Sequence, residues 1–197
     1  GGILIVDDDS PARTADKARE LSGRYPVQVA VRKERGLATA VMHGFSLSAS
    51  PYIAVMDADL SHPVSALSLL VAALQTGLCD LAVGSRYVPG GETFNWTAGR
   101  RINSLVATCL CRPLCALSDP MAGFFAFRRS LLPGVPLDPI GYKILLEIVV
   151  KCRVTRIEEV TIVFRNREHG QSKLNWKEQL NYLRHLGRLY AWRLTSR

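Results

Sequence analysis

The first 87 residues alternate short apolar runs with stretches of helical periodicity, and this alternation restricts the fold more than any other feature. The apolar runs are predicted strands, and the periodic stretches are predicted helices. We expect strands at 3–6, 27–31, 52–56 and 80–84, and helices at 12–24, 36–48 and 63–76. Parallel neighbours need a crossover connection, so a helix after each strand is typical of a parallel sheet. The sequence therefore predicts an α/β fold with a mostly parallel central sheet flanked by helices.

Beyond residue 91 the alternation gives way to longer helices. We expect helices at 99–117 and 143–150, strands at 124–127 and 160–164, and a C-terminal helix at 175–197. The last helix places apolar side chains on one side and arginines mostly elsewhere, the pattern of a basic amphipathic helix. A chain of 197 residues without an internal repeat is expected to form one domain.

The apolar run 52–56 ends in two carboxylates, Asp57 and Asp59, separated by one small residue. Open α/β sheets bind ligands at the carboxyl ends of their strands. In extended backbone, residues i and i+2 point the same way, so both carboxylates are expected to face one cation. The alternative is a helix N-cap, because Asp59 and Ser61 precede a helical pattern.

Other predicted strands also end in charged residues. The set expected along one sheet edge is Asp8, Asp57, Asp59 and Arg86. Two carboxylates can hold one hard divalent cation that bridges the oxygens of a diphosphate, and arginine or lysine supplies further positive charge. The residues alone therefore predict a site for a nucleotide diphosphate. Neither a GxxxxGK[S/T] loop nor a GxGxxG motif is present, which argues against P-loop and Rossmann dinucleotide binding.

The formal net charge of +8 indicates an anionic partner, which can be nucleic acid, a phosphorylated small molecule or an acidic membrane surface. The positive charge is dispersed and lacks a nucleic-acid-binding motif, so we expect no nucleic-acid partner. No run of about 18 apolar residues occurs, so we expect no membrane-spanning segment. Three clustered cysteines, Cys109, Cys111 and Cys115, lack a common zinc spacing and are expected to pack in the core.

Four motifs occur in order at fitting spacing along the chain: Val6-Asp7-Asp8-Asp9-Ser10-Pro11, Asp57-Ala58-Asp59-Leu60-Ser61-His62-Pro63, Gly84-Ser85-Arg86-Tyr87 and Gly170-Gln171-Ser172-Lys173-Leu174. Together they resemble the dolichyl-phosphate mannose synthase family, which comprises inverting glycosyltransferases of the GT-A fold. The segment 139–143 also resembles the acceptor side of that family. The resemblance extends over nearly the whole chain.

The resemblance implies an activity, substrates and a location. The expected reaction transfers mannose from GDP-mannose to dolichyl or another polyprenyl phosphate with inversion, and Mg²⁺ or Mn²⁺ is the expected cofactor. The C-terminal helix is expected to bind a membrane surface or a membrane subunit, at the cytoplasmic face of a membrane. Two alternatives stay open: a related transferase that uses UDP-glucose or another sugar nucleotide, and an inactive transferase module.

On the nucleotide and metal side, the resemblance implies roles for Val6, Asp8, Asp57, Ala58, Asp59 and Ser61. Val6 and Asp8 are expected to contact the guanosine. The other four are expected to form the metal and diphosphate motif, in which Ser61 ligates the metal directly or through water. The alternative for Asp8 is a solvated turn.

On the basic side, the resemblance implies roles for Arg86, Arg100, Ser104, Lys143, Arg167 and Lys173. Arg100 and Ser104 are expected to bind the acceptor phosphate. The others are expected to bind the nucleotide sugar, and Arg86 is assigned to catalysis together with Asp57 and Asp59. The alternatives are a strand-end cap for Arg86 and solvated surface charge for the remaining basic residues.

The start of the chain departs from the family pattern. Relatives open with an additional strand and helix, and that strand ends in a Pro-Thr-Tyr-Asn-Glu-like segment that lines the nucleotide base. This chain begins at what resembles the second strand of the family. We therefore expect a fold that lacks the first strand and helix, and weak or absent activity of this 197-residue chain.

Overall fold

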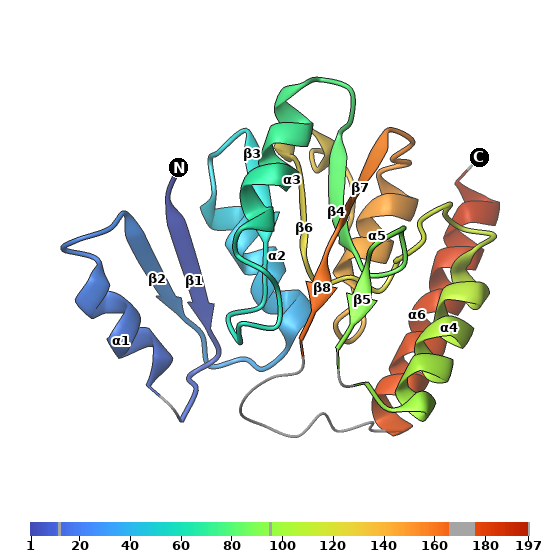
Figure 1. Cartoon of the computed structure of the whole chain (residues 1–197), viewed down its shortest axis with the longest axis horizontal. Helices are drawn as coiled ribbons and strands as arrows, with labels where there is room; N and C mark the ends of the chain where they lie inside the picture. Colours follow the sequence, from blue (N-terminus) through green and yellow to red (C-terminus); the bar gives the residue numbers. More distant parts are fainter. Residues whose placement is uncertain (12, 95, 166–175, 197) are drawn as a thin grey trace. The chain divides into compact units, whose positions relative to one another are not determined.

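The computed structural model describes residues 1–11, 13–94, 96–165 and 176–196 (Figure 1). The chain divides into two compact units, Gly1–Pro51 and Tyr52–Arg197, and each is described on its own.

The first unit is a βαβα segment. Its elements are β1 (Ile3–Asp7), α1 (Thr14–Leu21), β2 (Val27–Val31) and α2 (Leu37–Leu47). β1 and β2 pair in parallel, from Ile3 opposite Val27 to Asp7 opposite Val31. The crossover helix α1 buries Ala15 and Ala18, whose small side chains allow the helix to lie close to the strands. The expected strand–helix–strand pattern is confirmed here.

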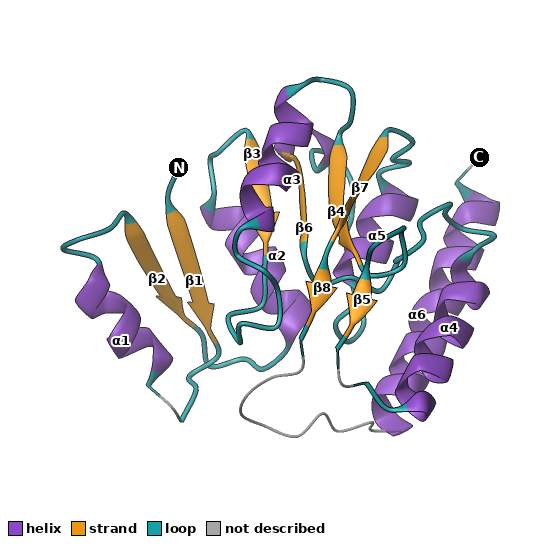
Figure 2. Cartoon of the chain, viewed as in Figure 1, coloured by secondary structure: helices purple, strands orange, loops and turns teal. Residues whose placement is uncertain are grey.

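The second unit is built on a four-stranded sheet of order β3-β6-β4-β7 (Figure 2). Its strands are β3 (Tyr52–Val55), β4 (Leu81–Ser85), β6 (Phe125–Arg128) and β7 (Ile157–Thr161). β6 lies between β3 and β4 and is antiparallel to both, whereas β4 and β7 are parallel. β3, β4 and β7 therefore run in the same direction, and their carboxyl ends reach the same edge of a mixed sheet.

The two central strands of this sheet are buried on both faces, which explains why they are continuous apolar runs in the sequence. The side chains of β4 from Leu81 to Val83 and those of β6 from Phe125 to Phe127 are fully buried. α3 (Ala66–Gln75) packs Leu70 and Leu74 against this core. Burial of such side chains contributes roughly 1.5–3 kcal/mol each, so this sheet is the rigid support for the loops at its edge.

The remaining elements are β5 (Glu92–Thr93), α4 (Ala98–Cys111), a 3₁₀ turn (Arg129–Leu131), α5 (Ile144–Lys151), β8 (Val163–Phe164) and α6 (Trp176–Thr195). β5 and β8 form a short parallel pair. Two hydrogen bonds join α4 and α6. The hydroxyl of Tyr182 donates to the carbonyl oxygen of Ala107, and that of Tyr190 donates to the carbonyl oxygen of Leu110. Within the described ranges, no helix has both the length and the apolar character needed to cross a membrane.

Candidate active site

Asp7, at the end of β1, forms hydrogen bonds within the protein. The side chain is buried, and its carboxylate accepts hydrogen bonds from the backbone N–H of Ala15 at 3.0 Å and from both the N–H and the hydroxyl of Ser10. Because the first N–H groups of a helix lack partners within the helix, this carboxylate stabilises the start of α1. Asp7 is therefore a structural residue.

Val6 and Asp8, which were predicted to contact the guanosine, lie on either side of Asp7. Val6 is half-buried and faces α2, where a Cβ atom on Gly44 would lie 3.5 Å from its Cγ2 atom. One oxygen of Asp8 accepts the backbone N–H of Gly36 at 2.8 Å, and the other lies 3.5 Å from Nε of Arg32. Asp8 thus fastens the start of α2, and its predicted nucleotide contact stays a prediction.

The second pair of aspartates follows β3 in a turn that we call the acidic turn, residues 57–61. β3 ends at Val55, Ala58 and Asp59 form a turn, and Leu60 has a left-handed backbone with φ of 59°. Oδ1 of Asp59 accepts the backbone N–H of Ser61 at 3.1 Å. The expectation that these carboxylates lie at the carboxyl end of a strand is confirmed, but the backbone that carries them is a turn and not an extended segment.

Asp57 contrasts with Asp7, because it accepts no hydrogen bond from any described residue. Its nearest charged neighbour is His62, whose Nε2 atom lies 3.6 Å from Oδ2. Gly123 is also close, since a Cβ atom there would lie 3.4 Å from Oδ2. The carboxylate is a quarter exposed, so it keeps both oxygens available to a ligand.

The acidic turn fits a hard cation that takes part of its coordination from a substrate. No cluster of three or more His, Cys, Asp or Glu side chains with metal-binding geometry occurs among the described residues. Mg²⁺ is often held by only one or two carboxylates, together with waters and substrate phosphates. Oγ of Ser61 is buried and has no hydrogen-bond partner among the residues that the structure describes, which leaves a further oxygen beside Asp59. Asp57, Asp59 and Ser61 are therefore the residues suited to hold such a cation.

Arg86, directly after β4, forms a buried bidentate ion pair with Asp119. Its Nε atom donates to Oδ2 at 2.7 Å, its Nη2 atom donates to Oδ1 at 2.6 Å, and its backbone N–H also donates to Oδ2. Arg86 is only 9% exposed and Asp119 is fully buried. Burial alone would lower the pKa of Arg86, but the hydrogen bonds and charge of Asp119 raise it, so Arg86 stays a cation.

Asp119 was not predicted as a site residue. Its backbone N–H and that of Ser118 donate to the carboxylate of Glu159, which fixes the turn that carries Asp119. Asp119 and Arg86 are 33 residues apart, so only the Asp-Pro turn signal was available in the sequence. The pair aligns the guanidinium at the sheet edge where β3 and β4 both end.

Two arginines and an indole form the centre of a group that we call the basic cluster, which comprises Arg86, Tyr87, Trp96, Arg100 and Ser104. The guanidinium of Arg100 lies 4.0 Å from the centre of the Trp96 ring, and that of Arg86 lies 5.0 Å from it. The hydroxyl of Tyr87 donates to Oγ of Ser104 at 2.7 Å. The structure therefore brings together Arg86, Arg100 and Ser104, and the phosphate-binding roles that the resemblance implies for them stay predictions.

Trp96 is a site residue that sequence reasoning missed. The side chain is buried, and its indole N–H has no hydrogen-bond partner in the described part of the chain. A buried donor without an acceptor is rare in folded proteins, and it indicates a ligand or an ordered water. Trp96 lines an open hollow of about 860 Å³, whose walls are Arg86, Tyr87, Gly91, Glu92, Thr93, Phe94, Trp96, Arg101 and Leu105.

Phe164 connects the acidic turn to the basic cluster. Its ring centre lies 5.1 Å from that of His62 and 5.8 Å from that of Trp96, and the guanidinium of Arg86 lies 5.5 Å from it. The backbone N–H of Arg165 donates to the carbonyl of Ser61 at 3.1 Å, which fastens this segment to the acidic turn. Candidate metal ligands and candidate phosphate ligands therefore flank one aromatic ring.

Lys143, at the start of α5, contributes a cation with an unusual pKa. Burial disfavours the ammonium form and Arg86 repels it, and together they lower the pKa of Lys143 to about 7 despite the opposing effect of Asp119. Its Nζ atom lies 4.1 Å from the ring centre of Tyr142. Arg167 and Lys173, the last two predicted ligands, lie outside the described residues.

A family model described as "Glycosyl transferase family 2" matches residues 2–135. The chain is 45% identical to a dolichol-phosphate mannosyltransferase from Pyrococcus furiosus over 96% of this chain and 55% of that protein. It is 36% identical to the enzyme of the same name from Saccharomyces cerevisiae, over 97% of this chain and 75% of that protein. A polyprenol monophosphomannose synthase from Mycolicibacterium smegmatis is 37% identical, over 88% of this chain and 70% of that protein. The chain thus spans little more than half of the Pyrococcus relative.

Among solved structures, glucosyl-3-phosphoglycerate synthase from Mycobacterium tuberculosis in complex with Mn²⁺, UDP-glucose and phosphoglyceric acid matches with a TM-score of 0.65 and 22% identity, over 93% of this chain and 68% of that one. A second structure, described as a mycobacterial protein, matches with a TM-score of 0.68 and 23% identity, over 94% of this chain and 65% of that one. These likenesses show the fold, and they confirm the expected α/β fold of the GT-A type.

Proposed function

We propose, because the chain belongs to glycosyl transferase family 2, that it transfers mannose from GDP-mannose to dolichyl or another polyprenyl phosphate. The observation that carries this proposal is the 45% identity to the dolichol-phosphate mannosyltransferase of Pyrococcus furiosus over 96% of the chain. The acidic turn and the basic cluster supply the charges that two phosphorylated substrates require.

The reaction needs little proton transfer. The acceptor is a phosphate monoester, so its oxygen is already an anion and requires no strong general base. This oxygen forms a bond to the anomeric carbon of mannose from the face opposite GDP, while the bond from that carbon to the diphosphate oxygen breaks. The configuration is inverted, and GDP leaves with the electron pair. The protein must therefore orient two anions and offset their mutual repulsion, which positioned cations achieve in a partly dry site.

The basic cluster is the proposed site of the acceptor phosphate. Thr97 accepts the backbone N–H of Arg100 at 3.3 Å and caps α4, which holds Arg100 in the first turn of the helix. The hydroxyl of Ser104 accepts a hydrogen bond from the hydroxyl of Tyr87, so its own O–H can be donated to a ligand. The unpaired indole N–H of Trp96 supports the same assignment, because a phosphate oxygen would give this buried donor an acceptor.

Arg86 and Lys143 are proposed to stabilise the negative charge that gathers on the departing diphosphate. Nη1 of Arg86 donates to no described residue, so the buried pair with Asp119 leaves one donor for a phosphate oxygen. Lys143 binds an anion best as an ammonium, and an anion in the site would raise its pKa.

The acidic turn is the proposed metal site, with Mg²⁺ or Mn²⁺ held by Asp57, Asp59 and Ser61. When bound, such a cation neutralises the diphosphate and makes it a better leaving group. Ala58, between the two carboxylates, is exposed and small, so it allows a diphosphate to approach the backbone of the turn. The nucleotide contacts of Val6, Asp8, Arg167 and Lys173 stay predictions.

A membrane surface is the proposed location of the acceptor. α4 exposes Ile102, Leu105, Val106 and Leu110, and α6 exposes Trp176, Leu180, Leu183 and Leu194. Exposed arginines accompany these side chains, among them Arg101 and Arg184. Apolar residues beside arginines suit an anionic lipid surface, where the apolar groups enter the headgroup region and the arginines bind phosphate. Docking on a membrane subunit and a position at the cytoplasmic face stay predictions.

A transfer assay tests the proposed activity. Radiolabelled GDP-mannose and UDP-glucose are offered in parallel, with dolichyl phosphate and Mg²⁺ or Mn²⁺. The proteins are the 197-residue chain and a longer chimera that adds the parts of the Pyrococcus relative outside the matched region. We expect mannosyl transfer by the chimera, reduced about 10²- to 10³-fold by Asp57→Asn, and weak or absent transfer by the 197-residue chain. Transfer from UDP-glucose alone would reassign the donor, and no transfer by either protein would contradict the proposal.

Vesicle co-sedimentation tests the membrane surface. The chain is expected to bind vesicles that contain anionic lipid, and charge reversal by Arg101→Glu with Arg184→Glu is expected to reduce binding. Each arginine near an anionic membrane surface contributes about 1 kcal/mol to binding, so the double variant should bind roughly 10- to 30-fold more weakly. Binding that is unaffected by the two substitutions would argue against this surface.

A further inference from the structure

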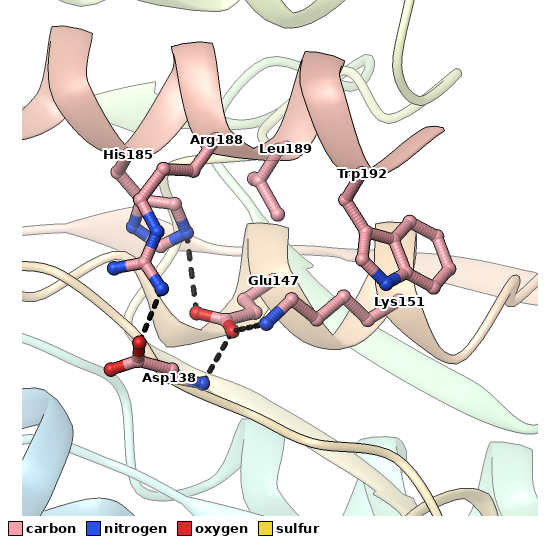
Figure 3. Close-up of a pocket in the computed structure, with 7 residues that line it drawn as sticks. All are labelled: Asp138, Glu147, Lys151, His185, Arg188, Leu189 and Trp192. Atoms are coloured by element: carbon pink, nitrogen blue, oxygen red, sulfur yellow. Dashed lines mark hydrogen bonds and ion pairs between the residues drawn. The ribbon is translucent and has the colours of Figure 1, made fainter. Parts of the chain in front are cut away.

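A buried pair of titratable side chains, Glu147 and His185, lies between α5 and α6, outside the site described above (Figure 3). The two side chains are 1% and 2% exposed, and Nε2 of the histidine lies 3.3 Å from Oε2 of the glutamate. They line a cavity of about 100 Å³ together with Asp138, Lys151, Arg188, Leu189 and Trp192. A buried charge between two helices is costly unless it is fully paired, so the partners of each side chain show how its charge is stabilised.

The carboxylate of Glu147 is held in its charged form. Burial alone would raise its pKa, but hydrogen bonding from His185, the backbone N–H of Asp138 and the ammonium of Lys151 lowers it. The Nζ atom of Lys151 lies 2.6 Å from Oε1. Oε2 and Nε2 have no other partner among the described residues, so a proton on Nε2 is required to satisfy both atoms.

The other ring nitrogen of His185 contacts the backbone of Ile140. Nδ1 lies 3.3 Å from the amide nitrogen of Ile140 and 3.2 Å from its carbonyl oxygen. A neutral ring with its proton on Nε2 accepts the N–H, and a protonated ring donates to the carbonyl. Ile140 is therefore bound in either protonation state of the histidine.

The pair fastens the chain just before Lys143. The backbone N–H of Asp138 donates to Oε1 of Glu147 at 2.6 Å, and that of Ile140 donates to His185. Pro139, between them, has no N–H, so both amide donors of 138–140 end on this pair. Arg188 of α6 binds the carboxylate of Asp138.

From this anchor the chain turns sharply toward the candidate active site. Gly141 has φ of 77°, a left-handed backbone, and a Cβ atom there would lie 3.2 Å from Oε2 of Glu178. The next two residues are Tyr142 and Lys143. A segment fixed at 138 and 140 and turned at 141 leaves Lys143 little freedom relative to the sheet edge that carries Arg86.

We propose that Glu147 and His185 are positioning residues that hold Lys143 beside Arg86 at the candidate active site. The part of this inference that concerns substrate rests on the proposed function, whereas the part that concerns the place of Lys143 does not. Because His185 projects from α6, whose outer face exposes Leu183, the pair also links that helix to the site. Neither residue is proposed to touch substrate.

The first experiment follows the titration of Lys143 by NMR in the intact chain, with ¹³C-methylated lysines and Lys143→Arg to assign the signal. The wild-type midpoint is expected near 7. His185→Ala is expected to raise it by about 1 unit or more, because a released lysine gains water and moves away from Arg86. His185→Asn, which keeps a polar group beside Ile140, is expected to restore most of the wild-type value.

The control is Leu189→Ala, one turn along α6 in the same cavity, which removes packing but leaves both nitrogen contacts. It is expected to lower the melting temperature without moving the Lys143 midpoint. If His185→Ala and His185→Asn both titrate like Leu189→Ala, the pair only stabilises the fold and the inference is overturned. The NMR titration needs no turnover, so it tests the positioning role even if the proposed reaction is wrong.

The second experiment is a double-mutant cycle on the KM for GDP-mannose. Lys143→Met and His185→Ala are each expected to raise KM, and the double variant is expected to be no worse than Lys143→Met alone, because both act through one ammonium. Multiplication of the two effects would contradict a positioning role. Absence of transfer by both the chain and the chimera would refute the proposed function and leave the NMR result standing.

Discussion

Asp7 and Asp57 occupy equivalent places in the sequence, each directly after an apolar strand, yet the structure uses them in opposite ways. The carboxylate of Asp7 is buried and accepts three hydrogen bonds from Ser10 and Ala15. That of Asp57 accepts none from the described residues and faces only His62, at 3.6 Å. A carboxylate that the fold has already satisfied is structural, whereas one left unsatisfied at a sheet edge is available to a ligand. The hydrogen-bond inventory separates the two, and the sequence pattern does not.

A third carboxylate, that of Asp119, is paired with a residue of the candidate site, Arg86. Its substitution should have the largest effect on stability. Asp119→Ala leaves the buried guanidinium of Arg86 without its counter-charge, and such a loss costs about 3–5 kcal/mol of unfolding free energy. Denaturant unfolding measures it. Asp119→Asn keeps the shape and part of the hydrogen bonding, so it should lose less. Equal stability of Asp119→Ala and the wild type would show that Arg86 has other partners.

Asp57→Asn should reduce activity and spare the fold. Loss of one positioned charge in an active site lowers kcat by about 10²- to 10³-fold, and no structural hydrogen bond of this side chain is lost. Transfer kinetics and thermal unfolding on the same preparation measure the two effects. A variant that melts well below the wild type would place Asp57 with Asp7 as a structural residue.

Asp7→Ala should show the reverse. Removing the acceptor of the Ala15 N–H is expected to cost about 2 kcal/mol of stability, the upper range for loss of a helix-capping side chain. Activity per folded molecule should stay near that of the wild type. Circular dichroism during urea unfolding gives the stability, and the comparison fails if activity falls while stability does not.

Trp96→Phe probes an unsatisfied donor in place of an unsatisfied acceptor. The ring and its contacts with the arginines are kept, but the indole N–H is lost, so the KM for acceptor phosphate should rise about fivefold. Stability should be unchanged or slightly higher, because a buried donor without an acceptor has been removed. A clear loss of stability would mean that the N–H already has an acceptor in the folded chain.

Lys143 gives the smallest effect on transfer, a pH dependence. Its lowered pKa of about 7 means that the ammonium is present below this pH and lost above it. Anion binding by Lys143 should therefore weaken as pH rises through 7, and the KM for GDP-mannose should rise a few-fold. Stability should move the other way: the unfolded lysine binds a proton up to higher pH, so unfolding free energy rises between about 7 and 10.5. Lys143→Arg, which stays charged, should abolish both trends.

Local patterns predicted the parts of this molecule that depend on neighbouring residues. The apolar run before Asp57 gave the end of β3 to within one residue, and the glycine after α3 marks its end with φ of 78°. The direction of β6 was beyond such reasoning, because an apolar run looks the same whichever way the strand is inserted. Its antiparallel place between β3 and β4 depends on contacts more than 40 residues apart.

The same limit applies to the candidate site. The family resemblance implied roles for Arg86, Arg100, Ser104 and Lys143, and the structure brings the first three into one cluster. Asp119 was missed because its role follows only from the distant arginine that it binds. The pair of Glu147 and His185 was missed for the same reason: each is an ordinary residue on its own helix, and only the packing of α5 on α6 joins them.

The position of Trp96 has an optical consequence. Trp96 is buried close to two guanidinium groups, whereas Trp176 is two-thirds exposed, so these two indoles lie in very different surroundings. An anion that accepts the indole N–H and draws the arginines away from the ring changes both the polarity and the charge around one chromophore. If the basic cluster binds the acceptor phosphate as proposed, the intrinsic fluorescence of the chain reports acceptor occupancy, and Trp96→Phe is the control.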